Sequence, residues 1–134
     1  MANALYGKGK EKLLTAAINL SSDTIKAALV SSAYTANLST NEWLSDISAF
    51  VLNTAQTLGT KTVTLGVFDA ADTTYTAVTS GSTAKAVVIY KDTGVAGTSA
   101  LLAYIDTITG FPLATNGGDI QIIWDSGANK IFAL

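Results

Sequence analysis

The sequence predicts a mainly β fold, an antiparallel β-sandwich or small barrel with one or two short helices and an N-terminal arm. Two apolar runs of strand length, residues 83–91 and 99–106, flank a loop that contains glycines. Shorter strand-like runs recur along the chain with turn residues between them, as in sandwiches and barrels. Charged residues make up only 13% of the chain and hydrophobic residues 49%, so much of the polar surface must come from Thr, Ser, Asn and Gly.

The two long runs predict a β-hairpin around which the other elements pack. Successive side chains of a strand point to opposite faces, so Val88 lies on one face while Val87 and Ile89 lie on the other. Because both faces are apolar, the hairpin is expected to be central in a two-layer structure or covered by another chain. Gly94 and Gly97 are expected to supply the positive φ angles of the connecting loop.

The N-terminal part of the chain predicts an arm and two short helices. Residues 1–9 contain two glycines and little periodicity, which indicates an extended arm. From Lys10 to about Asn19, apolar residues at helical spacing predict an amphipathic helix, which must dock on the sheet because two turns are unstable alone. Thr40 is placed to cap a second helix over residues 41–47. The apolar positions of the two helices are Leu13, Leu14, Ala17 and Ile18, and Trp43, Leu44 and Ile47.

Further strands are predicted at residues 24–30, 50–54, 61–65, 73–78, 120–124 and 130–134. In the run 61–65, strict alternation places Val63 and Leu65 inward. The sequence Asn-Gly-Gly-Asp at 116–119 predicts a tight turn of the hairpin type, after which Ile122 and Trp124 share a face.

The chain is expected to form one domain. Its 134 residues are enough to bury a core, and no linker divides them. Within this domain, residues 1–9 are expected to form the arm and residues 10–134 the sandwich.

Charge and composition exclude several classes of function. The net charge is −2 and the cations, all Lys, are scattered, which argues against nucleic-acid binding. Histidine and cysteine are absent, which removes the commonest general base and metal ligand as well as thiolate sites. No apolar run approaches the about 20 residues of a membrane span, and the first residues lack the basic-then-apolar order expected of a signal peptide. We therefore expect no catalytic, cofactor or metal residue, no membrane partner, and synthesis in a cytoplasm.

Some alternatives stay open at this point. Asp69 and Asp72 are the best-spaced carboxylate pair and could belong to a calcium site, although no spacing matches an EF-hand and aspartates at turns more often bond their own backbone. A glycan hydrolase would need two facing carboxylates, and no pair is singled out. The aromatic residues could line a sugar-binding groove, although aromatics at strand spacing more often belong to the core.

The interpretation favoured by composition is that the protein buries surface against copies of itself and against a larger partner. High apolar content, few charges and a glycine-containing arm are typical of such a protein. The candidate interface residues are Leu5, Tyr6, Lys8, Lys10, Tyr90 and Tyr104.

Turn and strand motifs along most of the chain point to a family. They are residues 88–94 (Val-Ile-Tyr-Lys-Asp-Thr-Gly), 103–106 (Ala-Tyr-Ile-Asp), 116–120, 124–125 and 131–132, with 5–13, 24–26 and 44–46 in the first half. In these motifs the chain resembles small virion structural proteins of tailed bacteriophages.

The resemblance implies a role as a capsid decoration or cement protein. Such a protein would form a homotrimer on the capsid surface of the virion, clamp neighbouring subunits of the major capsid protein, and be made in the host cytoplasm. The alternative within phages is a tail-fibre or receptor-binding tip domain, which would also be trimeric and rich in β-structure.

Overall fold

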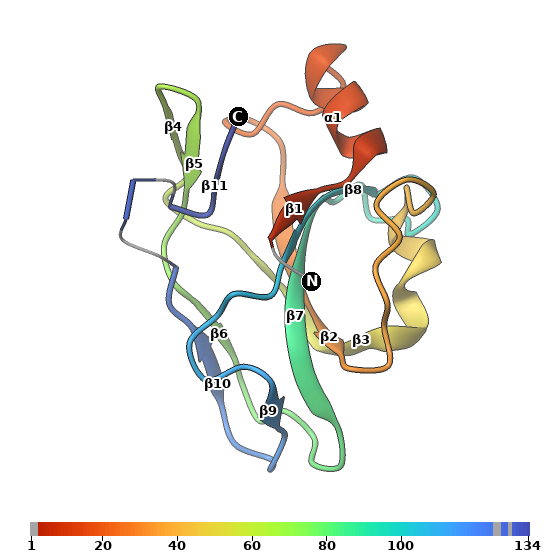
Figure 1. The fold of residues 1–134 in the computed structure, drawn as a ribbon, viewed down its shortest axis with the longest axis vertical. Coiled ribbons are helices and arrows are strands. Elements are labelled where there is room, and N and C mark those ends of the chain that lie inside the picture. Colours follow the sequence, from red (N-terminus) through yellow and green to blue (C-terminus); the bar gives the residue numbers. More distant parts are fainter. Residues whose placement is uncertain (1–2, 125–126, 129) are drawn as a thin grey trace.

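A computed structural model describes residues 3–124, 127–128 and 130–134 (Figure 1). A central antiparallel sheet runs in the order β1-β8-β7-β2-β3, with β9 pairing to the free end of β7. The mainly β prediction is confirmed, whereas the described strands do not close into a barrel. The strands of this sheet are β1 (Ala4–Leu5), β2 (Ile25–Ser31), β3 (Val51–Thr57), β7 (Thr83–Lys91), β8 (Ala100–Ile105) and β9 (Leu113–Ala114).

Smaller sheets form a layer against one face of the central sheet. They are β11-β5-β4 and β10-β6, made of β4 (Thr62–Thr64), β5 (Val67–Asp69), β6 (Thr73–Tyr75), β10 (Ile120–Ile122) and β11 (Phe132–Ala133). One core cluster joins the two layers, with Leu29 and Ile89 from the central sheet meeting Phe68, Ile122 and Trp124. The expectation that Ile122 and Trp124 share a buried face is confirmed.

The other face of the central sheet is covered by the chain itself. Residues 34–50 cross it and contain two short 3₁₀-helices, η1 (Leu44–Asp46) and η2 (Ser48–Phe50), in place of the single helix predicted over 41–47. Ile47 is fully buried there, while Trp43 extends the sheet through a bridge to Ala100. The hairpin formed by β7 and β8 is therefore central, with both faces buried, as its apolar pattern predicted.

Residues 4–9 are part of the fold and do not form an extended arm, while residues 1–2 of the predicted arm lie outside the described residues. Ala4 and Leu5 pair with β8, and the Tyr6 side chain is fully buried with its hydroxyl 2.7 Å from that of Tyr34. Helix α1 (Gly7–Leu14) begins inside the range predicted for the arm. A Cβ added at Gly9 would lie 2.7 Å from the Leu101 carbonyl oxygen, so this glycine lets the helix backbone approach β8. The glycines that suggested flexibility serve close packing.

Helix α1 also ends earlier than the pattern predicted. Ala16 adopts a φ of 61°, and the Ala17 N–H turns back to donate to the Lys12 carbonyl over 2.8 Å. Leu14 is consequently 87% exposed, whereas Ile18 reaches the core from the segment that follows the helix. Helical spacing was therefore misleading beyond residue 14, because Ile18, the last apolar position of the predicted helix, enters the core from outside the helix.

Three local expectations are corrected. Gly94 has a φ of 84°, but Gly97 is not among the glycines with positive φ. Residues 116–119 connect β9 to β10, which belong to different sheets, so this turn does not close a hairpin. Val63 and Leu65 are exposed, because the hairpin of β4 and β5 extends beyond the core that it was expected to face. Asp125, part of one motif of the family resemblance, lies outside the described residues.

Candidate interaction surfaces

An open groove of about 920 Å³ runs along the edge of the central sheet at β1. The start of α1, the end of β8 and β11 also contribute to its wall. Its apolar lining comes from Leu5, Leu38, Ile105, Ile123 and Phe132. Ile123 is 66% exposed, so a large apolar side chain faces solvent inside this groove.

The backbone of β1 presents one edge with which no other described strand pairs. The N–H of Tyr6 donates to the Leu102 carbonyl over 2.9 Å, and Ala4 is paired with Tyr104 two residues further along the ladder. Groups two residues apart on an antiparallel strand point to the same side, so the N–H and C=O of Leu5 point away from β8. An edge of this kind can accept an additional strand.

The charged side chains that line the groove are Lys10 and Lys130. Neither forms an ion pair within the described part of the chain. The polar lining includes Asn3, whose side-chain oxygen accepts the N–H groups of Asp106 and Thr107 at 2.9 Å each. The groove thus combines an apolar lining with positive charge.

The hairpin of β4 and β5 is the second surface, and it stands out from the rest of the molecule in Figure 1. Thr64 pairs with Val67, which leaves a two-residue turn at Leu65 (φ 52°) and Gly66 (φ 78°). Positive φ at both positions is the type I′ turn, which favours Asn, Asp or Gly at its first position. Leu65 is nevertheless 98% exposed there, and Val63 is 48% exposed beside it.

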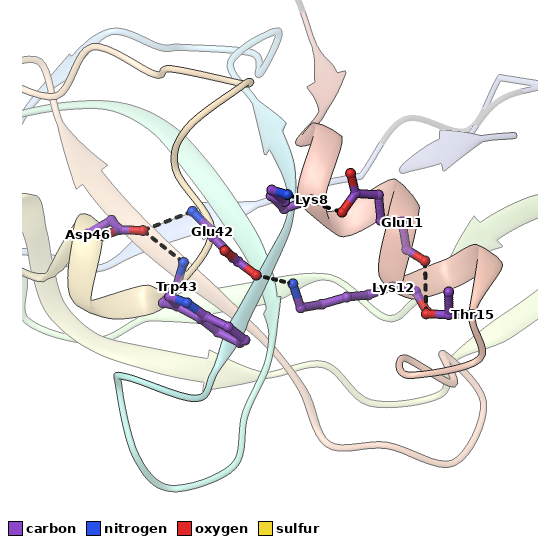
Figure 2. A network of polar contacts seen from close by, with 7 residues as sticks. All are labelled: Lys8, Glu11, Lys12, Thr15, Glu42, Trp43 and Asp46. Carbon is purple, nitrogen blue, oxygen red and sulfur yellow. Dashed lines mark hydrogen bonds and ion pairs between the residues drawn. The ribbon is translucent and has the colours of Figure 1, made fainter.

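A polar network holds α1 against the segment that precedes η1 (Figure 2). The Lys12 ammonium lies 2.6 Å from the Glu42 carboxylate and 4.4 Å from the centre of the Trp43 ring. The Asp46 carboxylate accepts the N–H groups of Trp43 and Glu42, and these bonds hold the pKa of Asp46 below its usual value. Lys12 is therefore committed to packing inside the chain and is not offered to a partner.

Breaking this network is expected to have a modest effect. We predict that Glu42→Gln lowers the free energy of unfolding by about 1 kcal/mol, because the Lys12–Glu42 pair is partly buried and Lys12 also lies over the Trp43 ring. Urea denaturation of the two proteins measures the difference. Lys8→Met is the matched control, since the Lys8–Glu11 pair is exposed and should be nearly neutral. Equal losses in both variants would contradict the prediction.

The six candidate interface residues divide into two groups. Leu5 and Lys10 line the groove, and Lys8 lies near it on α1 in an ion pair with Glu11. Tyr6, Tyr90 and Tyr104 are at most 3% exposed and belong to the core cluster beneath residues 34–50. The sequence showed that these tyrosines face an apolar layer, but not that the chain itself supplies that layer.

Two exposed apolar residues, Leu65 and Ile123, were missed. The signal for the first was present, since Gly66 after Leu65 fits a two-residue turn between strand-like runs. For Ile123 the signal was partial. Alternation placed its side chain on the face opposite Ile122 and Trp124, but its position in the groove depends on how β10 and β11 are placed relative to β1.

The buried phenols make the fold sensitive to alkali. Burial raises the pKa of Tyr6, Tyr75 and Tyr104, and it raises the pKa of Tyr90 to about 12, with the Asp92 charge adding to the effect. A pKa raised above the unfolded value of about 10 means that the folded state keeps its proton where the unfolded chain loses it. This contribution to stability is complete below pH of about 10 and is lost above it.

We therefore expect the melting temperature to be flat from neutral pH to about 9 and to fall steeply between about 10 and 12. Phenolate absorbance should rise together with unfolding. Tyr90→Phe should make the fall shallower, since it removes one of the groups that must stay neutral. A melting temperature that is unchanged up to pH of about 12 would contradict this assignment.

The described residues give no positive support to the alternatives left open by the sequence. They contain no group of three or more carboxylates placed to hold a metal ion. The Asp72 carboxylate accepts the N–H of Trp124 at 3.1 Å, a backbone-capping role. None of the helices in the described segments is long and apolar enough to span a membrane.

The fold and the two surfaces define a sandwich-like β domain that exposes apolar side chains in one protruding turn and one groove. The chain matches no protein-family model, and no curated protein matches it. Its function is accordingly argued from these surfaces.

Proposed function

We propose that this protein is a structural component of a phage virion, a capsid decoration or cement protein that forms a homotrimer and clamps neighbouring subunits of the major capsid protein. It is made in the host cytoplasm and acts on the capsid surface by adhesion, not by catalysis. The family resemblance of its turn and strand motifs suggests the virion, and the exposed surfaces support an adhesive role.

The observation that carries the adhesive role is Leu65. It is 98% exposed at a φ of 52°, so the isolated chain bears both backbone strain and hydrated apolar surface at one residue. Neither cost has a compensating contact within the described chain. Burial against another subunit would recover the apolar contribution.

The physical role of such a clamp follows from linkage. A protein that binds the assembled shell, and not its free subunits, shifts the equilibrium towards the shell. Three identical contacts held in one trimer would turn weak individual binding into durable attachment. The low proportion of charged residues, 13%, keeps the desolvation cost of covering large parts of the surface small.

The test is a measurement of copy number in purified virions of the phage that encodes the protein, by quantitative mass spectrometry against the major capsid protein. A copy number comparable with that of the capsid protein is expected. A few copies per particle would favour the tail-fibre or receptor-binding tip domain, and absence from the virion would overturn the proposal.

A further inference from the structure

We infer that the hairpin of β4 and β5 inserts Leu65 into the groove beside β1 of a second copy of this chain. Both surfaces belong to the same molecule, one convex and one concave. The inference rests on the proposed function only for the number of copies that assemble, which is three. The contact itself follows from the two surfaces.

The hairpin has the features of an inserted element. Its tip places Leu65 entirely in solvent, with Val63 on the strand behind it, and residues 62–68 carry no charge. All three residues of β4 are exposed. Leu is disfavoured at the first position of a type I′ turn, where Asn or Gly would relieve the strain. Keeping Leu at this position is advantageous if its side chain becomes buried in the assembled protein.

The groove has the features of a receiving site. Its volume of about 920 Å³ is ample for the side chains of Leu65 and Val63. Its lining includes the exposed side chain of Ile123, together with Leu5 and Phe132, so insertion would cover apolar surface on both copies.

The backbones of the two elements are also compatible. Thr64 and Val67 close the two-residue turn, so the N–H and C=O of Val63 point away from β5, and β4 is the outer strand of its sheet. The N–H and C=O of Leu5 point away from β8 in the same way. Pairing of β4 with β1 of the second copy would satisfy both sets of groups.

The charges around the groove also favour the hairpin of a second copy as its occupant. Lys10 and Lys130 line the groove, and an element that brought further cations would be repelled. The turn brings no charge. Of the two charged residues at the base of the hairpin, Lys61 donates from its ammonium to the Asp23 carbonyl of its own chain, whereas Asp69 has the sign opposite to that of the groove. A partner copy therefore offers the groove an apolar tip with a carboxylate behind it.

Symmetry decides what such a contact builds. A one-way contact between a convex and a concave patch joins identical subunits head to tail, and it closes a ring when the rotation fits. A ring of three copies is the homotrimer of the proposed function. In this ring every groove is filled by the Leu65 of a neighbour.

The test compares full-length variants by light scattering after gel filtration over a range of concentrations. Leu65→Asn relieves the turn strain, so it should melt no lower than the wild-type monomer while associating at least about tenfold more weakly. Ile123→Lys should weaken association from the groove side. Val95→Asn is the matched control, because Val95 is a 60% exposed residue on a loop outside both surfaces, and it should associate like the wild type.

Mixing gives the sharper result. Leu65→Asn keeps an intact groove and Ile123→Lys keeps an intact hairpin, so an equimolar mixture should form a one-to-one complex that neither variant forms alone. Association of Leu65→Asn as tight as that of the wild type would overturn the inference while leaving a homotrimer in place. Dissociation of Val95→Asn equal to that of Leu65→Asn would also overturn the inference, because the loss would then not depend on the hairpin. Conversely, if Leu65→Asn dissociates as expected but the wild-type protein is absent from virions, the proposed function is overturned and the contact between copies stands.

Discussion

Trp124→Ala is expected to lower the free energy of unfolding by about 3–5 kcal/mol, the usual cost of removing a large aromatic ring from a core. Trp124 is 7% exposed and packs in the cluster that joins the central sheet to the outer layer. Its indole N–H also donates to the Ala71 carbonyl over 3.0 Å, so the substitution removes a hydrogen bond together with the packing. Equilibrium unfolding in guanidinium chloride, followed by far-UV circular dichroism, measures the loss.

Trp124→Phe separates the two contributions. It keeps an aromatic ring in the core but cannot donate to Ala71, so its cost should be clearly smaller, about 1–3 kcal/mol. A change of less than about 0.5 kcal/mol for Trp124→Ala, as is typical of a surface substitution, would contradict the assignment of this ring to the core.

Gly9→Ala is expected to destabilise the protein by about 1–3 kcal/mol, the usual cost of overpacking, although alanine is the better helix former by about 1 kcal/mol. The added Cβ would lie 2.7 Å from the Leu101 carbonyl oxygen and 2.9 Å from the Leu102 Cα. Both are backbone atoms of a central strand and cannot move aside as a side chain would. The steric cost should therefore exceed the gain in helix propensity, and α1 should separate from β8.

Gly59→Ala is the matched control, because a Cβ at Gly59 would have nothing within 4 Å. It should change the melting temperature very little. Hydrogen exchange adds a local measurement, since Gly9→Ala should weaken the protection of α1 amides more than that of β7 amides. A Gly9→Ala variant as stable as the wild type would show that the helix does not pack as closely as described.

The parts of the fold that were predictable are those in which the pattern is local. Residues 83–91 are apolar on both faces and form β7 at those bounds, because a central strand is recognisable from its own composition. The strand predicted at residues 24–30, which is β2 in the structure, and the shared face of Ile122 and Trp124 were recognisable for the same reason.

The parts that were not predictable depend on contacts between distant segments. Gly9 belongs to a close helix–strand contact only because β8 lies beneath it, and nothing in the sequence around it shows this. Alternation in residues 61–65 correctly indicated a strand, but its apolar face is exposed because the hairpin extends past the core. Periodicity reports which side chains share a face, not what covers that face.

The candidate site shows the same division. Leu5 and Lys10 were predicted as interface residues and line the groove, whereas Tyr90 and Tyr104 are buried under residues 34–50 of the same chain. A low content of charged residues indicated covered surface in general. It did not distinguish a face covered by the chain's own loop from a face left for another subunit.

The central claim is that this protein works by burying apolar surface of its own copies against one another. The mass of the purified protein in solution, from light scattering, tests it most directly. The account predicts three times the chain mass of 13.8 kDa for the wild type and a single chain mass for Leu65→Asn. A wild-type protein that remains at the mass of one chain at every concentration would contradict it.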